Sequence, residues 1–419
     1  MKTIVLGGGI IGVTTAYYLA KDGHEVTVIE KNQEVGQEAT GVNAGLIAPG
    51  HCFAWASPAA PKMLIKSLFG EKTSIRVQPS LDFRFYTWGL QFLRECTSER
   101  AAINTLAKLE LSEYSQRKLY EIAAMENINY DQVTKGLLYL YRDESELELG
   151  LKKMELLSNE GVKMQVLDSQ TLPNVEPAFA HSTVKLAGAI HATDDASGNS
   201  ELFSRELRKR CEQLGVEFKF GITAKKFTES GGRITSLVTD QGVMVADQYV
   251  LAMGVSSPFL SRTVGQNLPV YPAKGFSMTV DIKNKEASPE LGGVDEKTLV
   301  AWSPMGDQMR ISSTAKFSGY NKSWKPSDFE AITSTGKELW PDAFDWSSAR
   351  MTAGLRPMTP DGTPIIGKGS KHSNLFYNTG HGHMGWTMSC GSSALLSDLM
   401  AGRTPEVRTA PFAVRSYRK

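Results

Sequence analysis

The chain opens on an apolar run that gives way first to glycines and then to a helical pattern. Residues 3–6, "TIVL", lead directly into "GGGIIG". Apolar residues then recur at helical spacing, namely Val13, Ala16, Tyr17 and Ala20. Gly23 suits the end of that helix, because glycine tolerates the left-handed conformation found there. The next run, "HEVTVIE", predicts a second strand that ends at Glu30.

Further along, segments with helical periodicity alternate with short apolar runs. We predict helices over residues 81–96, 99–126, 144–161, 194–215 and 327–339. We predict strands over residues 136–143, 216–227, 270–282, 298–304 and 308–314, and three short strands between residues 232 and 254. The helix over 81–96 is amphipathic. Its apolar face either packs on the core or forms a pocket lid or a membrane-contact patch.

The order of these elements predicts an α/β protein with two interleaved domains. A single core rarely grows beyond about 250–300 residues, and the chain has 419. We expect a Rossmann-like nucleotide-binding domain and an α+β substrate-binding domain inserted into it. The first is expected over residues 1–80, 185–260 and 346–419, and the second over residues 81–184 and 261–345.

Composition narrows the class of protein. Hydrophobic residues make up 41% and charged residues 22%, which is typical of a soluble globular chain. A net charge of +1 argues against nucleic acid as a partner. The four cysteines lack CxxC spacing, so neither a metal site nor a disulfide framework is expected. The first apolar run does not read as a signal peptide, and no apolar run reaches about 18 residues, so we expect the cytosol or the cytosolic face of the membrane.

The glycines after the first strand form a dinucleotide-binding fingerprint. Gly7, Gly9 and Gly12 give G-x-G-x-x-G between a strand and a helix. Gly7 allows the tight turn, Gly9 lets the backbone approach a pyrophosphate, and Gly12 lets the helix pack close to the strand. The helix N-terminus favours the pyrophosphate because its N–H groups are unpaired. Glu30 can accept hydrogen bonds from the ribose hydroxyls.

A second glycine- and alanine-rich loop, "EVGQEATGVNAGLIAPG" over residues 34–50, distinguishes the dinucleotide. FAD is long and needs a second stretch of backbone for its ribityl chain and ring, so we predict FAD rather than NAD. The patterns "ATGVNAGLI", "DQYVLAMG" over 246–254 and the glycine-rich start of the last helix resemble the D-amino-acid-oxidase-like flavoproteins. That resemblance implies FAD bound by both the N-terminal unit and a C-terminal segment.

The resemblance implies a set of cofactor-binding residues. These are Gly7, Gly9, Ile10, Ile11, Gly12, Glu30, Lys31, Thr40, Asn43, Ala44, Gly45, Leu46, Ala224, Ala252, Gly254, Gly380, His381, Gly382, Met384, Gly385, Trp386 and Thr387. The FAD is expected to be non-covalent. Val42 precedes "NAG", and the family positions that carry a linking histidine or cysteine are not so filled.

Arg356 is the leading candidate for binding a substrate carboxylate. It lies in "GLRPMTPDGTPIIG", residues 354–367, where glycines and prolines predict a rigid turn-rich mount. The planar guanidinium fork matches a carboxylate, and "GLRPMTP" also resembles the family's substrate-carboxylate stretch. A structural or surface arginine is the alternative. Arg310 is a second candidate, although a strand arginine facing solvent is the favoured interpretation there.

Two further residues are predicted near the reaction. Lys274 lies in "YPAKGFS", which resembles the family's return strand beside the flavin, so it either contacts flavin or substrate or is a solvated lysine. His381 and His383 lie in "NTGHGHMGW". His383 is the candidate base, although hydride transfer from a neutral amine needs no base, and a role in loop structure is the favoured interpretation.

Across nearly its whole length the chain looks most like bacterial D-amino acid dehydrogenases. The resemblance implies oxidation of a D-amino acid, with D-alanine typical, to an imino acid that hydrolyses to a 2-oxo acid and ammonia. Electrons would pass to a quinone or another carrier, with contact to the membrane surface. Three alternatives stay open: a secondary or cyclic amino acid as substrate (D-hydroxyproline, sarcosine or glycine), a nicotinamide dehydrogenase, and a flavoprotein without catalytic activity.

Overall fold

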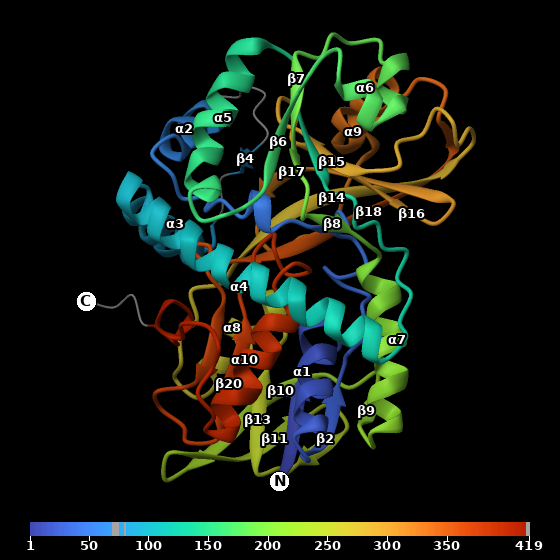
Figure 1. Ribbon diagram of the computed structural model, residues 1–419. Coiled ribbons are helices and arrows are strands. Elements are labelled where there is room, and N and C mark those ends of the chain that lie inside the picture. The colour runs from blue at the N-terminus through green and yellow to red at the C-terminus, as the bar shows by residue number, and fades with distance from the viewer. Residues whose placement is uncertain (69–74, 79–80, 416–419) are drawn as a thin grey trace.

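The computed structural model describes residues 1–68, 75–78 and 81–415. These residues build a lower lobe around one sheet, which contains the N-terminus, and an upper lobe around a larger sheet (Figure 1). We call the two the N-terminal sheet and the large sheet. A long helix, α4 (Ser98–Met125), runs across the junction between the lobes.

The N-terminal sheet is built from segments that lie far apart in the chain. Its order is β19 (Ile365–Lys368), β20 (Leu375–Thr379), β13 (Gln248–Leu251), β1 (Lys2–Leu6), β2 (Glu25–Ile29) and β9 (Glu217–Lys219). All neighbours are parallel except β19, which runs antiparallel to β20. The strand–helix–strand unit predicted for the first residues is confirmed, with α1 (Ile10–Lys21) between β1 and β2.

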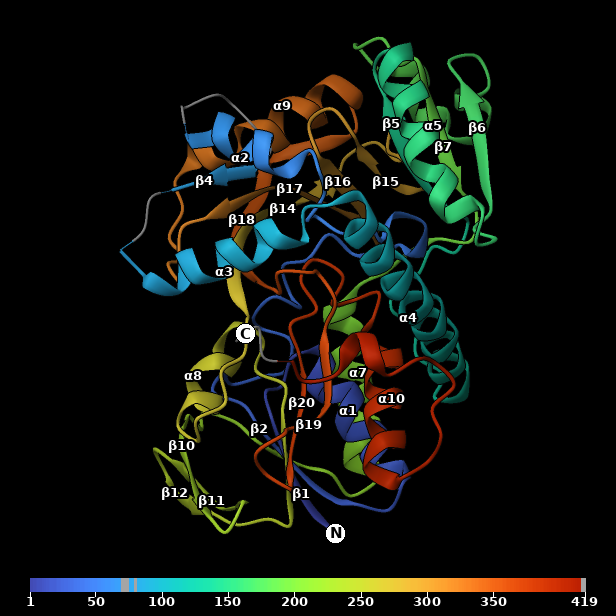
Figure 2. The same cartoon turned by 90° about the vertical axis from the view of Figure 1, so that its left-hand side faces the viewer.

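Both faces of the N-terminal sheet are covered, as expected for parallel strands. On one face α1 packs against α7 (Ser200–Gln213) and α10 (Ser389–Ala401), and α4 packs on α10 (Figure 2). On the other face lie α8 (Ser257–Arg262) and a small antiparallel sheet. That small sheet contains β10 (Ala224–Ser230), β11 (Arg233–Thr239) and β12 (Gly242–Met244). The three strands predicted between residues 232 and 254 are therefore confirmed as β11, β12 and β13.

The large sheet is mostly antiparallel and forms the upper lobe. Its order is β18 (Phe344–Met358), β14 (Tyr271–Ile282), β17 (Gln308–Phe317), β16 (Val300–Met305), β15 (Gly292–Asp295), β5 (Leu137–Tyr141), β7 (Gly188–Ala192) and β6 (Met164–Asp168), with β4 (Ile75–Val77) beside β17. Its apolar core includes the fully buried Trp302 and Trp340.

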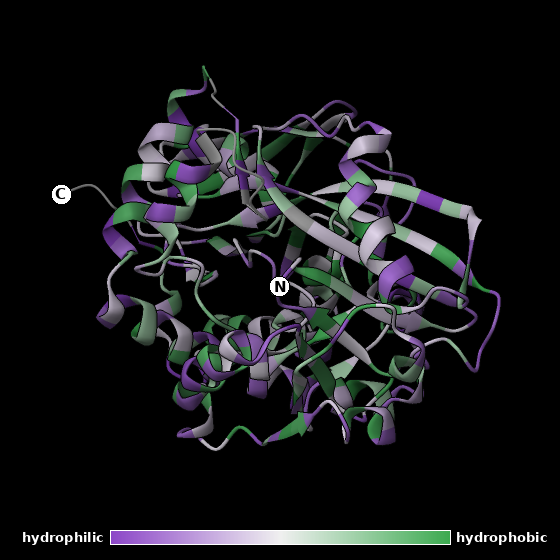
Figure 3. Cartoon of the chain, turned by 90° about the horizontal axis from the view of Figure 1, so that it is seen from above, coloured by the Kyte–Doolittle hydropathy of each residue, from purple (hydrophilic) through white to green (hydrophobic). Residues whose placement is uncertain are grey.

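Helices flank the large sheet. They are α2 (Ala60–Leu68), α3 (Phe83–Glu95), α5 (Glu144–Ser158), α6 (Leu172–Val175) and α9 (Glu330–Leu339). Seen from above, the outer helices mix hydrophobic and hydrophilic residues along their length (Figure 3). A two-stranded pair, β3 (Leu46–Ile47) with β8 (Ala196–Ser197), lies between the lobes. Within the described residues, no helix is both long and apolar enough to cross a membrane.

The structure differs from the predicted boundaries in three places. Residues 188–192 and 346–358 pair within the large sheet rather than the N-terminal one, and the boundary expected at residue 80 lies outside the described residues. The single strand predicted over 216–227 is broken between β9 and β10, where Gly221 adopts φ +69°. Residues 354–358 are strand rather than turn, because they pair along β14.

Candidate active site

A cavity of about 1330 Å³ opens between the carboxyl ends of the N-terminal sheet and one face of the large sheet. Ligand sites of α/β proteins lie at this edge of the parallel strands. Its walls come from β1, β14, β17 and β18, from residues 252–256 after β13, and from the loops over residues 38–46 and 378–387. The cavity is larger than the roughly 300–1,000 Å³ typical of one small ligand, so it has room for a long cofactor and a substrate.

Most of the predicted site residues line this cavity. All of the predicted cofactor-binding residues do so except Gly12 and Gly380, and Arg356 and His383 also do so. Gly12 has the packing role expected of it, because a Cβ there would lie 1.8 Å from the Gly7 carbonyl oxygen. Lys274 lies outside the lining.

The glycine-rich turn forms a cradle that a side chain would fill. Gly7 has φ +108°, and a Cβ on it would approach the Ala252 carbonyl oxygen to 2.6 Å. The turn is held by Glu30, whose Oε2 accepts a 2.6 Å hydrogen bond from the Gly8 N–H. At the start of α1 the Ile10 N–H donates to Thr40 Oγ1 (3.0 Å), and the other first-turn N–H groups have no carbonyl partner within the helix, where Ile10 and Ile11 line the cavity. This arrangement fits an anionic pyrophosphate.

The loop over residues 38–46 is held by hydrogen bonds from both lobes. The Asn43 amide donates to the Thr40 carbonyl oxygen (2.8 Å) and to the Ser200 hydroxyl (2.6 Å), and its oxygen accepts from the Gly45 N–H (2.7 Å). From the large sheet, Arg310 donates to the carbonyl oxygens of Gly41 (2.9 Å) and Asn43 (3.2 Å). The expectation that Arg310 faces solvent is therefore wrong. Its guanidinium supports the loop and is not among the residues that line the cavity.

The C-terminal loop lies opposite and carries the two histidines. Gly382 has φ +58°, which glycine tolerates. The His381 ring is buried and makes a 3.0 Å hydrogen bond with the Ser392 hydroxyl, and burial lowers its pKa to about 3. The His383 ring stacks on Trp55 at a centroid distance of 4.8 Å. Burial, and then the charges of Lys108 and Arg356, hold the pKa of His383 well below its usual range, so it is neutral at pH 7.

Arg356 reaches the cavity from the end of β18. Its backbone pairs with Ala273 of β14, and the guanidinium lies over the next residue but one, Gly275. A Cβ on Gly275 would lie 2.6 Å from Arg356 Nη2, so only glycine leaves room for this side chain. Burial lowers the pKa of Arg356 to about 10, which still keeps it charged at pH 7. Arg356 lines the cavity.

Lys274 points away from the cavity because side chains alternate along β14. Its Nζ donates a 2.8 Å hydrogen bond to the Ser323 carbonyl oxygen, and burial lowers its pKa. The expected contact with flavin or substrate is not supported by this placement.

Among the lining residues that the sequence reasoning missed are Gly275, His51 and Glu296. Gly275 follows Lys274 in "AKGF". Its contact with Arg356 becomes recognisable only from the pairing of β14 with β18. His51 and Glu296 are far apart in the chain and meet as an ion pair, with Nε2 and Oε1 2.7 Å apart. Within the described residues, the histidines, cysteines and carboxylates form no cluster suited to a metal ion.

Comparison with known proteins places this geometry in a family. Residues 2–399 match the model of the FAD dependent oxidoreductase family. The chain is 41% identical over 408 residues to D-amino acid dehydrogenase 2 of Mesorhizobium japonicum, covering 97% of this chain and 98% of that protein. It is 40% identical over 417 residues to D-amino acid dehydrogenase of Allorhizobium ampelinum, covering 100% and 99%.

Solved structures share the fold at lower identity. Glycine oxidase from Geobacillus kaustophilus superposes with a TM-score of 0.76 at 22% identity, over 100% of this chain and 99% of that one. L-amino acid deaminase from Proteus vulgaris gives 0.71 at 19% identity, over 100% and 93%. With a matching family model across nearly the whole chain and full-length relatives at about 40% identity, the chain belongs to the FAD-dependent oxidoreductase family.

Proposed function

We propose that this chain oxidises D-amino acids at Cα and passes the electrons to a carrier other than oxygen. The observation that carries the proposal is Arg356, a charged guanidinium held at the wall of a cavity that also contains the dinucleotide cradle. The full-length similarity to D-amino acid dehydrogenases supports the substrate class. The product would be an imino acid, which water converts to a 2-oxo acid and ammonia.

Arg356 would bind the substrate carboxylate through its planar fork and so fix the position of Cα. FAD, when bound, supplies a two-electron acceptor for the Cα hydrogen. Gly7, Ile11 and the loop over residues 40–46 would hold its pyrophosphate and ribityl chain, and the loop over 380–387 would flank its ring. Glu30 would accept from the ribose hydroxyls.

The charge of Arg356 favours the reactive form of the amine. Oxidation requires a neutral amine, and a nearby positive charge lowers the pKa of an ammonium group. Arg356 supplies that charge, and His383 is neutral and adds none. His383 would therefore shape the pocket through its stack on Trp55 and not act as a cationic acid.

The proposal is tested by anaerobic bleaching of the flavin with D- and L-enantiomers of a panel of amino acids. We expect bleaching by D-amino acids such as D-alanine. Bleaching only by sarcosine, glycine or D-hydroxyproline would move the function to secondary or cyclic amines.

The proposed role of Arg356 in binding the substrate carboxylate is tested by the substitution Arg356→Ala. Because it removes charge-assisted hydrogen bonds, we expect kcat/KM to fall about 100-fold with FAD still bound. Arg356→Lys keeps the charge without the fork and should recover only part of the loss. Arg350→Ala, an exposed arginine on the same strand, is the matched control. Unchanged substrate affinity in Arg356→Ala would place the carboxylate site elsewhere.

We also propose that the acceptor is a membrane quinone or a carrier reached at a membrane surface. One face of α3 supports this: Phe83, Tyr86, Leu90 and Leu93 recur at helical spacing and are exposed by 76%, 50%, 62% and 46%. Replacing Leu90 and Leu93 by Glu should abolish binding to anionic lipid vesicles and leave dye-linked activity unchanged. Equal vesicle binding by that variant would contradict the proposed surface.

A further inference from the structure

Besides Arg356, the cavity is lined by a second polar group, the His51–Glu296 pair. His51 Nε2 and Glu296 Oε1 lie 2.7 Å apart, and both residues line the cavity. His383, stacked on Trp55, lines the same cavity as Arg356 and the His51–Glu296 pair. Arg356, His51 and Glu296 line one cavity, so a substrate whose carboxylate is held at Arg356 can extend its side chain toward the His51–Glu296 pair.

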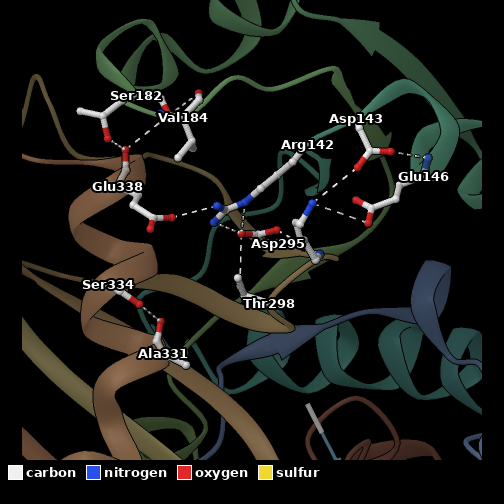
Figure 4. Close-up of polar contacts among 12 residues, drawn as sticks. Arg142, Asp143, Glu146, Ser182, Val184, Asp295, Thr298, Ala331, Ser334 and Glu338 are labelled. Atoms are coloured by element: carbon white, nitrogen blue, oxygen red, sulfur yellow. Dashed lines mark hydrogen bonds and ion pairs between the residues drawn. The ribbon is translucent and has the colours of Figure 1, made fainter. Parts of the chain in front are cut away.

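Glu296 is rigidly mounted. It follows β15 directly, and its N–H donates to the Leu140 carbonyl oxygen of β5 (3.0 Å). The preceding residue, Asp295, is fully buried and accepts from Arg142 Nε (2.9 Å) and Nη2 (2.5 Å), and Arg142 also binds Glu338 (Figure 4). Because successive side chains of a strand alternate, this anchor on one face leaves Glu296 directed to the other, where the cavity lies.

His51 is mounted as firmly. Its ring stacks on Tyr139 with centroids 4.5 Å apart and planes 14° from parallel. The Tyr139 hydroxyl donates to Asp195 Oδ2 (2.7 Å), and Asp195 Oδ1 accepts from the Gly50 N–H (2.8 Å), next to His51 in the chain. These contacts fix the histidine against one oxygen of Glu296.

The carboxylate of Glu296 keeps capacity for a ligand. Burial by itself would raise its pKa, but the His51 and Lys153 charges lower that pKa to about 2, so it is ionised at pH 7. Lys153 is held at 4.3 Å over the Phe53 ring. Among the described residues, Glu296 makes no side-chain contact within ion-pair distance other than the one with His51. Its second oxygen is therefore available to accept a hydrogen bond from a cation.

We propose that Glu296, oriented by His51, binds the substrate side chain and selects D-amino acids whose side chain ends in an ammonium or guanidinium group. The proposal rests on the proposed function for the identity of the substrate. Acidic side chains are disfavoured by repulsion from the same carboxylate.

The kinetic test compares D-lysine, D-arginine, D-alanine and D-glutamate in rapid anaerobic flavin reduction, which separates the substrate Kd from the reduction rate. In Glu296→Gln we expect Kd for D-lysine and D-arginine to rise about tenfold or more, from loss of one charge-assisted bond. The reduction rate, and Kd for D-alanine, should change less than about twofold. Glu290→Gln, the same substitution at a residue outside the cavity lining, is the matched control.

Equal losses for D-alanine and D-lysine in Glu296→Gln would show that Glu296 contacts the common α-amino group, and would overturn the proposal. A wild-type preference for acidic side chains would overturn it as well.

A binding test needs neither turnover nor a variant. ε-Aminocaproate is lysine without its α-amino group, and caproate lacks both amines. We expect the wild-type holoenzyme to bind ε-aminocaproate about tenfold or more tightly than caproate, measured by perturbation of the flavin absorption spectrum. Equal affinities would overturn the proposal. If no D-amino acid bleaches the flavin, the proposed function fails, but this comparison still tests the role of Glu296.

Discussion

The absence of a side chain at Gly275 leaves the space that the Arg356 guanidinium occupies. Adding a Cβ at Gly275 would place a carbon 2.6 Å from Arg356 Nη2, so Gly275→Ala should push the guanidinium out of position. We expect kcat/KM to fall about tenfold or more, mainly through KM, with FAD retained. Gly89→Ala, where a Cβ meets nothing within 4 Å, is the control, and it should stabilise α3 slightly. Similar kinetics for the two variants would contradict this role.

Among single residues, the sequence predicted those whose role depends on neighbours in the chain. The glycine fingerprint and Glu30 are recognisable because the turn, the helix N-terminus and the acidic strand end are adjacent in the chain. His51, Glu296 and Gly275 acquire their role only through pairings between segments far apart in the chain. The orientations of Lys274 and Arg310 depend on strand register, which a single strand does not specify.

At the scale of elements, β17 supports the loop over residues 38–46 through Arg310. Arg310 holds the carbonyl oxygens of Gly41 and Asn43, and its Nε donates to the Thr279 hydroxyl at 2.6 Å. Arg310→Ala should leave these carbonyls without a buried donor and loosen the loop. We expect FAD to dissociate about tenfold faster, measured by the recovery of free-flavin fluorescence, whereas Arg350→Ala should match the wild type. Unchanged FAD release in Arg310→Ala would show that the loop is held by other contacts.

Most helices and strands follow from hydrophobic periodicity, but β18 does not. Pro357 and the flanking glycines predict a turn, yet the strand continues to Met358. β18 is the last strand in its sheet order, and proline is tolerated on an edge strand because no partner needs its N–H there. The turn signal was correct only for residues 359–364, where the Thr359 hydroxyl donates to the Thr363 carbonyl oxygen and the Thr363 N–H donates to Asp361.

At the scale of the whole molecule, Lys108 couples global stability to pH. It lies fully buried in α4, its Nζ donates to the Phe53 carbonyl oxygen (2.9 Å), and burial lowers its pKa from 10.5 to about 8. Between these values the unfolded chain binds the extra proton, so the free energy of unfolding rises with pH. Relative to Lys108→Met, the wild type should gain up to about 3 kcal/mol between pH 8 and pH 10.5.

Denaturant unfolding of both proteins across that pH range measures this difference. If the free energy of unfolding changes equally with pH in the two proteins, Lys108 has the same pKa in the folded and unfolded chains.

The fold class was predictable as a whole because the nucleotide-binding unit is local and the later strands alternate with helices. The division between sheets was harder to predict. β7 and β18 belong to the large sheet, but the elements that follow each of them return to the other lobe.

The order of strands in the N-terminal sheet also has a consequence for the timing of synthesis. β1 and β2 leave the ribosome first, but their neighbour β13 spans 248–251, and β20, which closes on β13, spans 375–379. The loop over residues 380–387 emerges later still. Cofactor loading must therefore wait until the chain is almost complete, and a nascent chain stalled before residue 375 should carry the fingerprint glycines and retain no FAD.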